Sequence, residues 1–209
     1  TRYKLDDFKP YLFKTEDYGA SWTAINDGIH RQAFTRVIRA DPARKGLLYA
    51  GTESGLYISL DDGRHWSPFQ CNLPIVPITD LAVKNGDLIV ATQGRSFWLM
   101  DDLSPIHQWT PELMGKEMQL LAIQPTIRMR GGGSRSPGRT AGQNALAGVP
   151  IRFYSKAVPD EKMKIELQIL DPSGELIQTF STQPDVNRKQ KKLKVVAGVN
   201  ELRWDMRYQ

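Results

Sequence analysis

The side chains in this sequence that could do chemistry are carboxylates, arginines and histidines. Hydrolysis of a glycosidic bond needs two carboxyl groups, roughly 5 to 9.5 Å apart, that flank the bond. Acidic residues are plentiful, but no spacing marks a pair among them: Asp27, Glu53, Asp80, Asp101 and Asp102. The three histidines lack a ligand spacing such as His-x-x-x-His, and the chain has one cysteine. We therefore assign no catalytic residue, metal ligand or cofactor from the sequence.

Two short segments that share a pattern of hydroxyl, acid, glycine and tryptophan organise the first half of the chain. The first repeat has the elements Thr15, Asp17, Gly19 and Trp22, and the second repeat has Ser59, Asp61, Gly63 and Trp66. Asp17 and Asp61 are 44 positions apart, and such a period with a β pattern is typical of propeller blades. Aspartate can bond the backbone two residues on, and glycine tolerates positive φ. We therefore expect each repeat to fold a hairpin turn, after which the tryptophan anchors the next strand.

The shared pattern Ser/Thr-x-Asp-x-Gly-x-x-Trp resembles the Asp-box, or BNR repeat, of sialidases, xyloglucanase-type glycosidases and the sortilin ectodomain. In those families the box folds a turn on the face opposite the active site. The resemblance therefore implies a structural role, and not a catalytic one, for Asp17 and Asp61. The arginine-containing entry motif of sialidases, Arg-Ile-Pro, is absent from the sequence.

Hydrophobic patterning predicts two blades and the end of a third. Residues 11–22 supply the last hairpin of a first blade. A complete blade follows, with strands at 34–40, 47–52, 55–59 and 65–69. A last blade has strands at 78–83, 87–92 and 96–100, with a hairpin turn at Asn85-Gly86. Where a third box should close this blade, residues 100–105 lack the glycine and the tryptophan, so we interpret the box as degenerate or lost.

The rest of the chain reads as a linker and a second β domain. Residues 1–109 hold the blades, and residues 110–149 form the linker. The linker contains a short helix that starts at Thr110-Pro111-Glu112 and a Gly-rich loop at 131–138. Residues 150–209 form a β-sandwich domain, with strands at 151–154, 163–169, 176–180, 193–196 and 199–208. A full immunoglobulin-like sandwich takes ~7 strands, so this one is either truncated or completed elsewhere.

The fold class is therefore all-β: a partial β-propeller of two blades plus part of a third, followed by an immunoglobulin-like β-sandwich. Four stretches, at 2–11, 46–53, 91–98 and 198–207, look like the large bacterial BNR-repeat proteins labelled glycosyl hydrolase or sortilin-like. In such proteins this region would be the last blades and the β-sandwich that follows. The resemblance implies a secreted or periplasmic bacterial parent whose reaction is unproven.

Topology indicates where a ligand would bind. If the boxes lie between the third and fourth strands, the opposite face is built by the loops between second and third strands and by the links between blades. Loops on a rigid β scaffold concentrate binding residues. The candidate ligand contacts on this loop face are Arg95, Glu53, Arg31 and Asp27. Arg95 is the strongest, because a glycine precedes it and Phe97-Trp98 follow.

Two functions remain open for the parent. The first is a carbohydrate-active enzyme acting on a polysaccharide or glycan, in which this part is structural or ligand-binding and not catalytic. The alternative is a sortilin-like propeller that binds peptides or proteins without enzymatic activity. In both cases the expected partners are the ligand, the remaining blades and, because an open arc of blades exposes an apolar face, another copy of the chain.

Composition argues against other classes of partner. Hydrophobic residues make up 40% of the chain and charged residues 24%, as in ordinary globular domains. The net charge is +5 at pH 7, but the basic residues are scattered except in Arg128–Arg130, Arg135, Arg139 and Lys189–Lys192, so we expect no nucleic-acid binding. No apolar run approaches the ~20 residues of a membrane span, and the first residues do not form a signal peptide.

Overall fold

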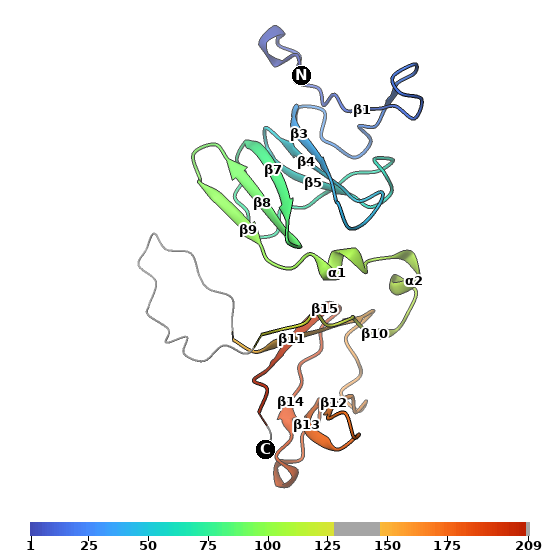
Figure 1. The fold of residues 1–209 in the computed structure, drawn as a ribbon, viewed down its shortest axis with the longest axis vertical. Coiled ribbons are helices and arrows are strands. Elements are labelled where there is room, and N and C mark those ends of the chain that lie inside the picture. The colour runs from blue at the N-terminus through green and yellow to red at the C-terminus, as the bar shows by residue number, and fades with distance from the viewer. Residues whose placement is uncertain (128–146, 208–209) are drawn as a thin grey trace. The chain divides into compact units, whose positions relative to one another are not determined.

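The computed structural model describes residues 1–127 and 147–207 and forms two compact units, Thr1–Leu103 and Ser104–Gln209. The chain is all-β with a few short helices (Figure 1). The division at Leu103 falls six residues before the boundary expected at 109, so the segment that the sequence assigns to a linker starts inside the second unit. The expected Gly-rich loop and the basic residues Arg128 to Arg139 lie outside the described residues.

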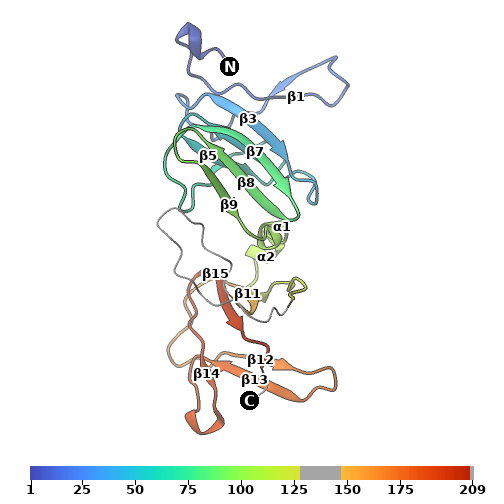
Figure 2. The ribbon, with the colours of Figure 1, turned by 60° about the vertical axis from the view of Figure 1, so that its left-hand side comes forward.

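The first unit consists of one hairpin and two antiparallel sheets, preceded by the 3-10 turn η1 (Tyr3–Leu5). The hairpin pairs β1 (Phe13–Lys14) with β2 (Thr23–Ala24). The central sheet has the order β3 (Thr35–Ala40), β4 (Leu48–Thr52), β5 (Gly55–Ser59) and β6 (Ser67–Pro68). The last sheet has the order β7 (Ile78–Lys84), β8 (Asp87–Thr92) and β9 (Phe97–Met100) (Figures 1 and 2). The strands predicted for these regions are therefore present, within a few residues at their ends.

The central sheet is covered on both faces. Every residue of β4 and β5 is buried, which follows from their apolar composition and small residues. On one face, Leu48, Ala50 and Tyr57 form a cluster with Leu12, Ile29, Ala33 and Trp66. On the other face, β3 and β4 lie against β7 of the last sheet. Burial on both sides makes the central sheet the core of the first unit.

Two contacts fix how the central sheet meets the last sheet. Gly51 leaves no room for a side chain, since a Cβ atom there would lie 2.6 Å from Cγ2 of Ile78 and 2.7 Å from Cγ1 of Val37. Arg39 on β3 reaches across to β7, where its Nε donates to the Leu81 carbonyl oxygen at 2.8 Å and its Nη2 binds Asp80 Oδ1 at 2.6 Å. The two sheets therefore stack closely through their first strands.

The outer face of the last sheet is apolar and open. Phe97 is 76% exposed and Leu99 is 59% exposed. The register places Phe97 beside Ala91, and Leu99 beside Ile89, on this same face. The equivalent face of the central sheet is the one that the last sheet covers. Within the described residues, an apolar sheet face is thus left exposed, as expected from the sequence.

The second unit contains two three-stranded sheets and two helical turns. The turns are α1 (Ser104–His107) and α2 (Pro111–Met114). One sheet has the order β10 (Met118–Leu120), β11 (Val149–Ser155) and β15 (Gly198–Trp204). The other has β12 (Glu166–Leu170), β13 (Leu176–Ser181) and β14 (Lys191–Lys192), with η2 (Val186–Arg188) before β14. Phe153 of the first sheet and Phe180 of the second share one core cluster, so the unit is a two-layer β structure.

The short helix predicted at Thr110 is confirmed. The Thr110 hydroxyl accepts the N–H of Leu113 at 3.3 Å, and Pro111 occupies the first helical position. The turn predicted at 171–174 also forms, because Asp171 Oδ1 accepts the N–H groups of Ser173 and Glu175 at 2.8 and 2.9 Å. Local turn and cap chemistry therefore determines these two features.

Two strand predictions for the second domain are wrong in part, and one strand was not predicted. The strand predicted at 193–196 is absent, since β14 is two residues long, ends at Lys192 and pairs parallel to β13. Leu193 and Val195 still pack into the core, because their alternation reflects burial without strand pairing. The strand predicted from 163 begins at Glu166, and Met163 is exposed. β10 was not predicted, because a three-residue strand carries too little periodicity.

Gly51→Ala should lower the free energy of unfolding of the first unit by about 1–3 kcal/mol, as overpacking of a filled core does. Thermal and urea unfolding followed by circular dichroism would measure the change. Gly51→Ala combined with Val37→Ala should cost less than the sum of the two single changes, because Val37→Ala removes the obstructing Cγ1 methyl group. Gly115→Ala is the control, since a Cβ atom there meets nothing closer than 3.5 Å. Equal stability of Gly51→Ala and the wild type would contradict close packing at Gly51.

Candidate functional site

The first repeat folds a hairpin turn through its own side chains. Thr15 Oγ1 donates to Asp17 Oδ1 and accepts the Gly19 N–H, both at 2.8 Å. Asp17 Oδ1 also accepts the Ser21 N–H at 2.8 Å. Tyr18 and Gly19 both have positive φ, at 57° and 95°. The acid of this repeat is thus committed to holding the turn between β1 and β2.

The second repeat makes the same bonds at the same offsets. Ser59 Oγ donates to Asp61 Oδ1 at 2.8 Å and accepts the Gly63 N–H at 2.9 Å. Asp61 Oδ1 accepts the His65 N–H at 2.9 Å. Asp62 and Gly63 have positive φ, at 64° and 86°. The hydroxyl, acid and glycine of both repeats therefore have the turn-forming geometry that the sequence predicts for them.

The two tryptophans differ in their surroundings. Trp66 is 3% exposed; its Nε1 donates to the Ile25 carbonyl oxygen at 2.7 Å, and its backbone N–H donates to the Asp27 carbonyl oxygen at 2.8 Å. Trp22 is 61% exposed, and its Nε1 donates to the Gly19 carbonyl oxygen at 3.2 Å. In the described residues only the second repeat has a neighbouring layer that buries its tryptophan.

The turn bonds lower the pKa of both aspartates. Hydrogen bonds from the Ser21 hydroxyl and N–H and from the Thr15 hydroxyl lower the pKa of Asp17 to about 2. Burial alone would raise the pKa of Asp61, but the hydrogen bonds from His65 and Ser59 outweigh it and lower the pKa. Both groups are ionised at neutral pH, whereas a general acid needs a raised pKa. Their electrostatics thus suit a structural role.

Glu53 lies at the turn between β4 and β5, in a cluster of charge and aromatic rings. Its Oε2 accepts from Arg36 Nη2 at 2.5 Å and Nε at 2.7 Å. The Arg36 guanidinium lies 5.1 Å from the centre of the Phe34 ring. The Tyr3 ring stacks on the Phe34 ring, with 4.6 Å between the ring centres. Glu53 therefore sits in a built polar and aromatic cluster.

Asp27 lies against the second repeat, away from Glu53. Its Oδ2 is 3.3 Å from His65 Nε2, and His65 Nδ1 is 3.0 Å from Asp61 Oδ2. The link that follows β2 passes directly beside the second repeat, which explains this position. His65 thus bridges two carboxylates, and Asp27 contributes to the repeat.

Arg95 and Arg31 are exposed on two different loops. Arg95 lies in the turn between β8 and β9, where its carbonyl oxygen accepts from Trp98 Nε1 at 3.0 Å. Arg31 lies in the link between β2 and β3. Neither guanidinium pairs with another residue of the described chain. Among the described residues, no hydrogen bond or ion pair joins Glu53 to Arg31, Asp27 or Arg95, so the four candidates do not form one contact cluster.

The turns that carry Glu53 and Arg95 are equivalent. The Glu53 N–H donates to the Phe34 carbonyl oxygen at 3.1 Å, and the Gln93 N–H donates to the Pro77 carbonyl oxygen at 2.9 Å. The hydroxyls of Thr52 and Thr92 each donate to a carbonyl oxygen across their turn, at 2.9 and 2.6 Å. Since the two sheets stack, both turns emerge at one end of neighbouring sheets, which we name the loop end.

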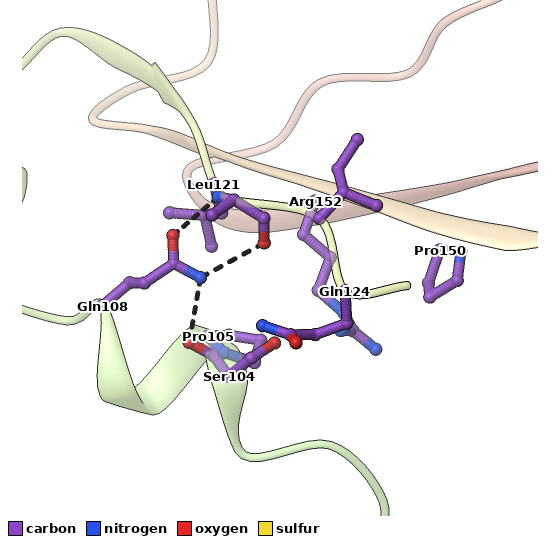
Figure 3. Close-up of a pocket in the computed structure, with 9 residues that line it drawn as sticks. Ser104, Pro105, Gln108, Leu121, Gln124, Pro150 and Arg152 are labelled. Atoms are coloured by element: carbon purple, nitrogen blue, oxygen red, sulfur yellow. Dashed lines mark hydrogen bonds between the residues drawn. The ribbon is translucent and has the colours of Figure 1, made fainter. Parts of the chain in front are cut away.

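The second unit has a cavity of about 10 Å³, the space of one water at most. Gln108 closes one side of it (Figure 3). Its Nε2 donates to the carbonyl oxygens of Ser104 and Ala122 at 3.0 and 3.3 Å, and its Oε1 accepts the Ala122 N–H at 2.6 Å. The Gln108 side-chain amide thereby pairs with the backbone of Ala122, just after β10, as a neighbouring strand would. The residues around this cavity connect α1 to the chain after β10, and the cavity has no room for a ligand.

No protein-family model and no curated protein sequence match the chain. Among residues 1–127 and 147–207, no group of three or more potential metal ligands comes together. No helix in the described part of the chain has the length and apolar character to cross a membrane.

Sequence reasoning missed Arg36 and His65. The signal for Arg36 was available, because a hairpin between residues 34–40 and 47–52 pairs Thr35 with Thr52 and so brings Arg36 beside Glu53. His65 could not be found in this way. Its contact with Asp27 joins the second repeat to a link whose path no local pattern indicates.

Asp61→Ala should destabilise the first unit by about 1–3 kcal/mol, because it leaves the His65 N–H and the Ser59 hydroxyl without their acceptor. Thermal unfolding would show this, and ligand affinity measured well below the midpoint should not change. Asp101→Ala is the control, an exposed acid that contacts no repeat. A variant with native stability and lost ligand binding would contradict the structural role.

The stability of the first unit should fall as the pH drops from about 4 to about 2. The folded-state pKa of Asp17, about 2, lies below its usual value of 3.8. An acid with a depressed folded pKa stabilises the fold above its unfolded pKa and loses this contribution as it becomes protonated in the folded state. The Asp17→Asn/Asp61→Asn double variant should show a smaller fall in thermal midpoint over this range. Parallel curves for the two proteins would rule the turn carboxylates out as the cause.

Proposed function

We propose that the chain is the ligand-binding, non-catalytic part of a secreted bacterial BNR-repeat protein. Its first unit would be two blades and part of a third of an Asp-box propeller, and its second unit an immunoglobulin-like sandwich. Support comes from the repeat bonds at Asp17 and Asp61 and from the stacking of the central sheet between two neighbours. Secretion rests on the family resemblance alone.

The state of the acids favours binding over hydrolysis. Asp17 and Asp61 are held in turn bonds, Glu53 pairs with Arg36, and Asp80 pairs with Arg39. A glycosidase needs one carboxyl group with a raised pKa beside another that stays ionised. The pKa is lowered, not raised, for Asp7, Asp17, Asp61, Glu112 and Asp171. The chain therefore fits a scaffold and binding role.

The observation that carries the ligand class is Arg95. Its guanidinium is exposed at the loop end with no partner among the described residues, and the exposed Phe97 follows two positions later in the chain. A guanidinium binds carboxylates through two parallel hydrogen bonds, and a ring face provides apolar area for a sugar. We therefore take the ligand to be a carboxylate-bearing polysaccharide, bound by the loop end.

Arg95→Ala should weaken binding of polygalacturonate roughly tenfold or more, since loss of one charge-assisted contact costs about 1.5–3 kcal/mol. Isothermal titration with polygalacturonate, and with neutral xyloglucan as the uncharged comparison, measures this. Lys84→Ala is the matched control, because it removes a cation at the other end of the same sheet. Equal binding by both variants, or equal binding of both polysaccharides, would refute the assignment.

The purified chain should release no reducing sugar from a panel of glycosides that includes both polysaccharides. The physical reason is that Asp17 and Asp61 are engaged in turns, and Glu53 and Asp80 in ion pairs. Chromatography of the products after prolonged incubation is the measurement. Turnover that survives further purification and disappears on substitution of an acid would show that the chain is an enzyme.

A further inference from the structure

The link after β2 and the link after β6 begin alike, at a spacing of 44 residues, although the positive φ of their turns falls at Gly28 (91°) in the first link and at Cys71 (45°) in the second. Ile25 N–H donates to the Leu12 carbonyl oxygen at 2.9 Å, and Phe69 N–H donates to the Leu56 carbonyl oxygen at 2.8 Å. In each link, the side chain of the following residue accepts the N–H group that the backbone carbonyl would otherwise accept. Asn26 Oδ1 accepts the Leu12 N–H at 2.6 Å, and Gln70 Oε1 accepts the Leu56 N–H at 3.2 Å.

This substitution leaves a carbonyl oxygen available in each link. The Ile25 carbonyl would otherwise pair with the Leu12 N–H, and it accepts the indole N–H of Trp66 instead. The Phe69 carbonyl is released in the same way, since Gln70 takes the Leu56 N–H. No donor among the described residues reaches the Phe69 carbonyl oxygen, which corresponds to Ile25, the acceptor of the Trp66 indole. The second link therefore leaves unused the indole acceptor that the first link uses.

The apolar surroundings of Trp66 also recur one sheet further on. Pairing registers match Leu48 with Leu88, Ala50 with Val90, and Tyr57 with Trp98. The link spacing matches Leu12 with Leu56 and Ile29 with Leu73. The second set lines a hollow beside β9: Leu56, Leu73, Leu88, Val90 and Trp98, with Phe69 at the rim. We call this hollow the slot.

Beside the slot, β9 has an open edge. β5 pairs with β4 on one side and with β6 on the other, where β6 directly follows Trp66. β9 pairs with β8 alone within the described chain (Figure 2). After Met100 the chain enters α1 at Ser104, and it supplies neither a tryptophan nor a fourth strand there.

We propose that the slot and the β9 edge together dock an extended strand of a partner polypeptide, led by a tryptophan. The strand adds to β9 as β6 adds to β5, and strand addition to an exposed edge is an established mode of peptide recognition. The indole fills the slot and donates to the Phe69 carbonyl oxygen. This docking does not use the Arg95 guanidinium and does not depend on the proposed function.

One residue restrains the docking. Gly28 stands where the Trp66 backbone approaches, since a Cβ atom there would lie 2.0 Å from the Trp66 carbonyl oxygen. Asn72 occupies the equivalent sequence position in the second link, where the positive φ falls on Cys71 and not on Asn72. Docking with the geometry of Trp66 therefore requires this turn to adopt the conformation of the first link, which glycine favours, so Asn72→Gly should tighten binding.

Cys71 offers a direct probe of the docked geometry. It is a free, exposed cysteine at the position equivalent to Asp27, which lies beside His65, the residue before Trp66. A synthetic peptide with the sequence of residues 59–70, carrying cysteine in place of His65, should therefore form a disulfide with Cys71 when its tryptophan is seated. Disulfides form only where the two Cα atoms come within roughly 7 Å.

The experiment measures disulfide capture by the full chain under cystamine exchange, read by mass spectrometry. We expect at least tenfold more capture of this peptide than of the same peptide with alanine for tryptophan. Asn72→Gly should increase capture, and Leu73→Phe, which fills the slot with a larger apolar residue, should reduce it. Circular dichroism checks that both variants are folded.

Other outcomes would overturn the proposal. Equal capture of the two peptides would mean that Cys71 reacts without docking. A chain that is dimeric by light scattering, becomes monomeric on Trp22→Ala and captures neither peptide would mean that a second copy occupies the slot through its exposed Trp22. Unchanged capture by folded Leu73→Phe would place the tryptophan elsewhere.

Discussion

The hydrogen bond from the Trp66 indole to the Ile25 carbonyl is the interaction on which the first unit depends. It joins the turn of the second repeat to the chain that leaves the hairpin, so it connects two layers that share no strand pairing. The bond can form only because Asn26 relieves Ile25 of its usual partner. Around it, the buried ring packs with residues from β4 and β5 and from the link after β2.

Charges outside this core act in the same direction. Lys14, on β1, pairs with Asp62 of the second repeat and with Glu16 of the first. The hydrogen bonds that Lys14 donates to Asp62 and then to Glu16 raise the pKa of Lys14, so the cation persists well above neutral pH. Exposed ion pairs contribute little stability individually. Their arrangement here mainly selects the register in which the hairpin meets the central sheet.

The sequence predicts the first unit well because its strands alternate and its turns have specific chemistry. The turn at Asp61 and Gly63 needs an acceptor side chain at the first position and a residue that tolerates positive φ at the second. The turn at Asn85-Gly86 needs two residues that tolerate positive φ. Prediction failed where strands are short or pairing is non-local. β14 has two residues, and its parallel partner β13 is set by tertiary packing that no local pattern encodes.

The candidate site was harder to predict for a related reason. Arg95 and Glu53 could be placed in loops, since loops follow from strand ends. Their separate surroundings could not, because side-chain partners such as Arg36 depend on the register between strands. Asp27 shows the limit clearly: its position follows from the path of a link between layers, and its contact with His65 has no counterpart in the spacing of residues.

The burial of both faces of the central sheet has a consequence for folding order. β4 and β5 have no side that faces water, so they gain little from pairing until the hairpin and β7 have arrived. Their amide hydrogens should therefore exchange with solvent only when the whole unit opens, whereas those of the exposed strand β9 exchange through local opening. The first unit thus behaves as one cooperative element whose least accessible backbone lies at its centre, with an outer sheet that can fray on its own.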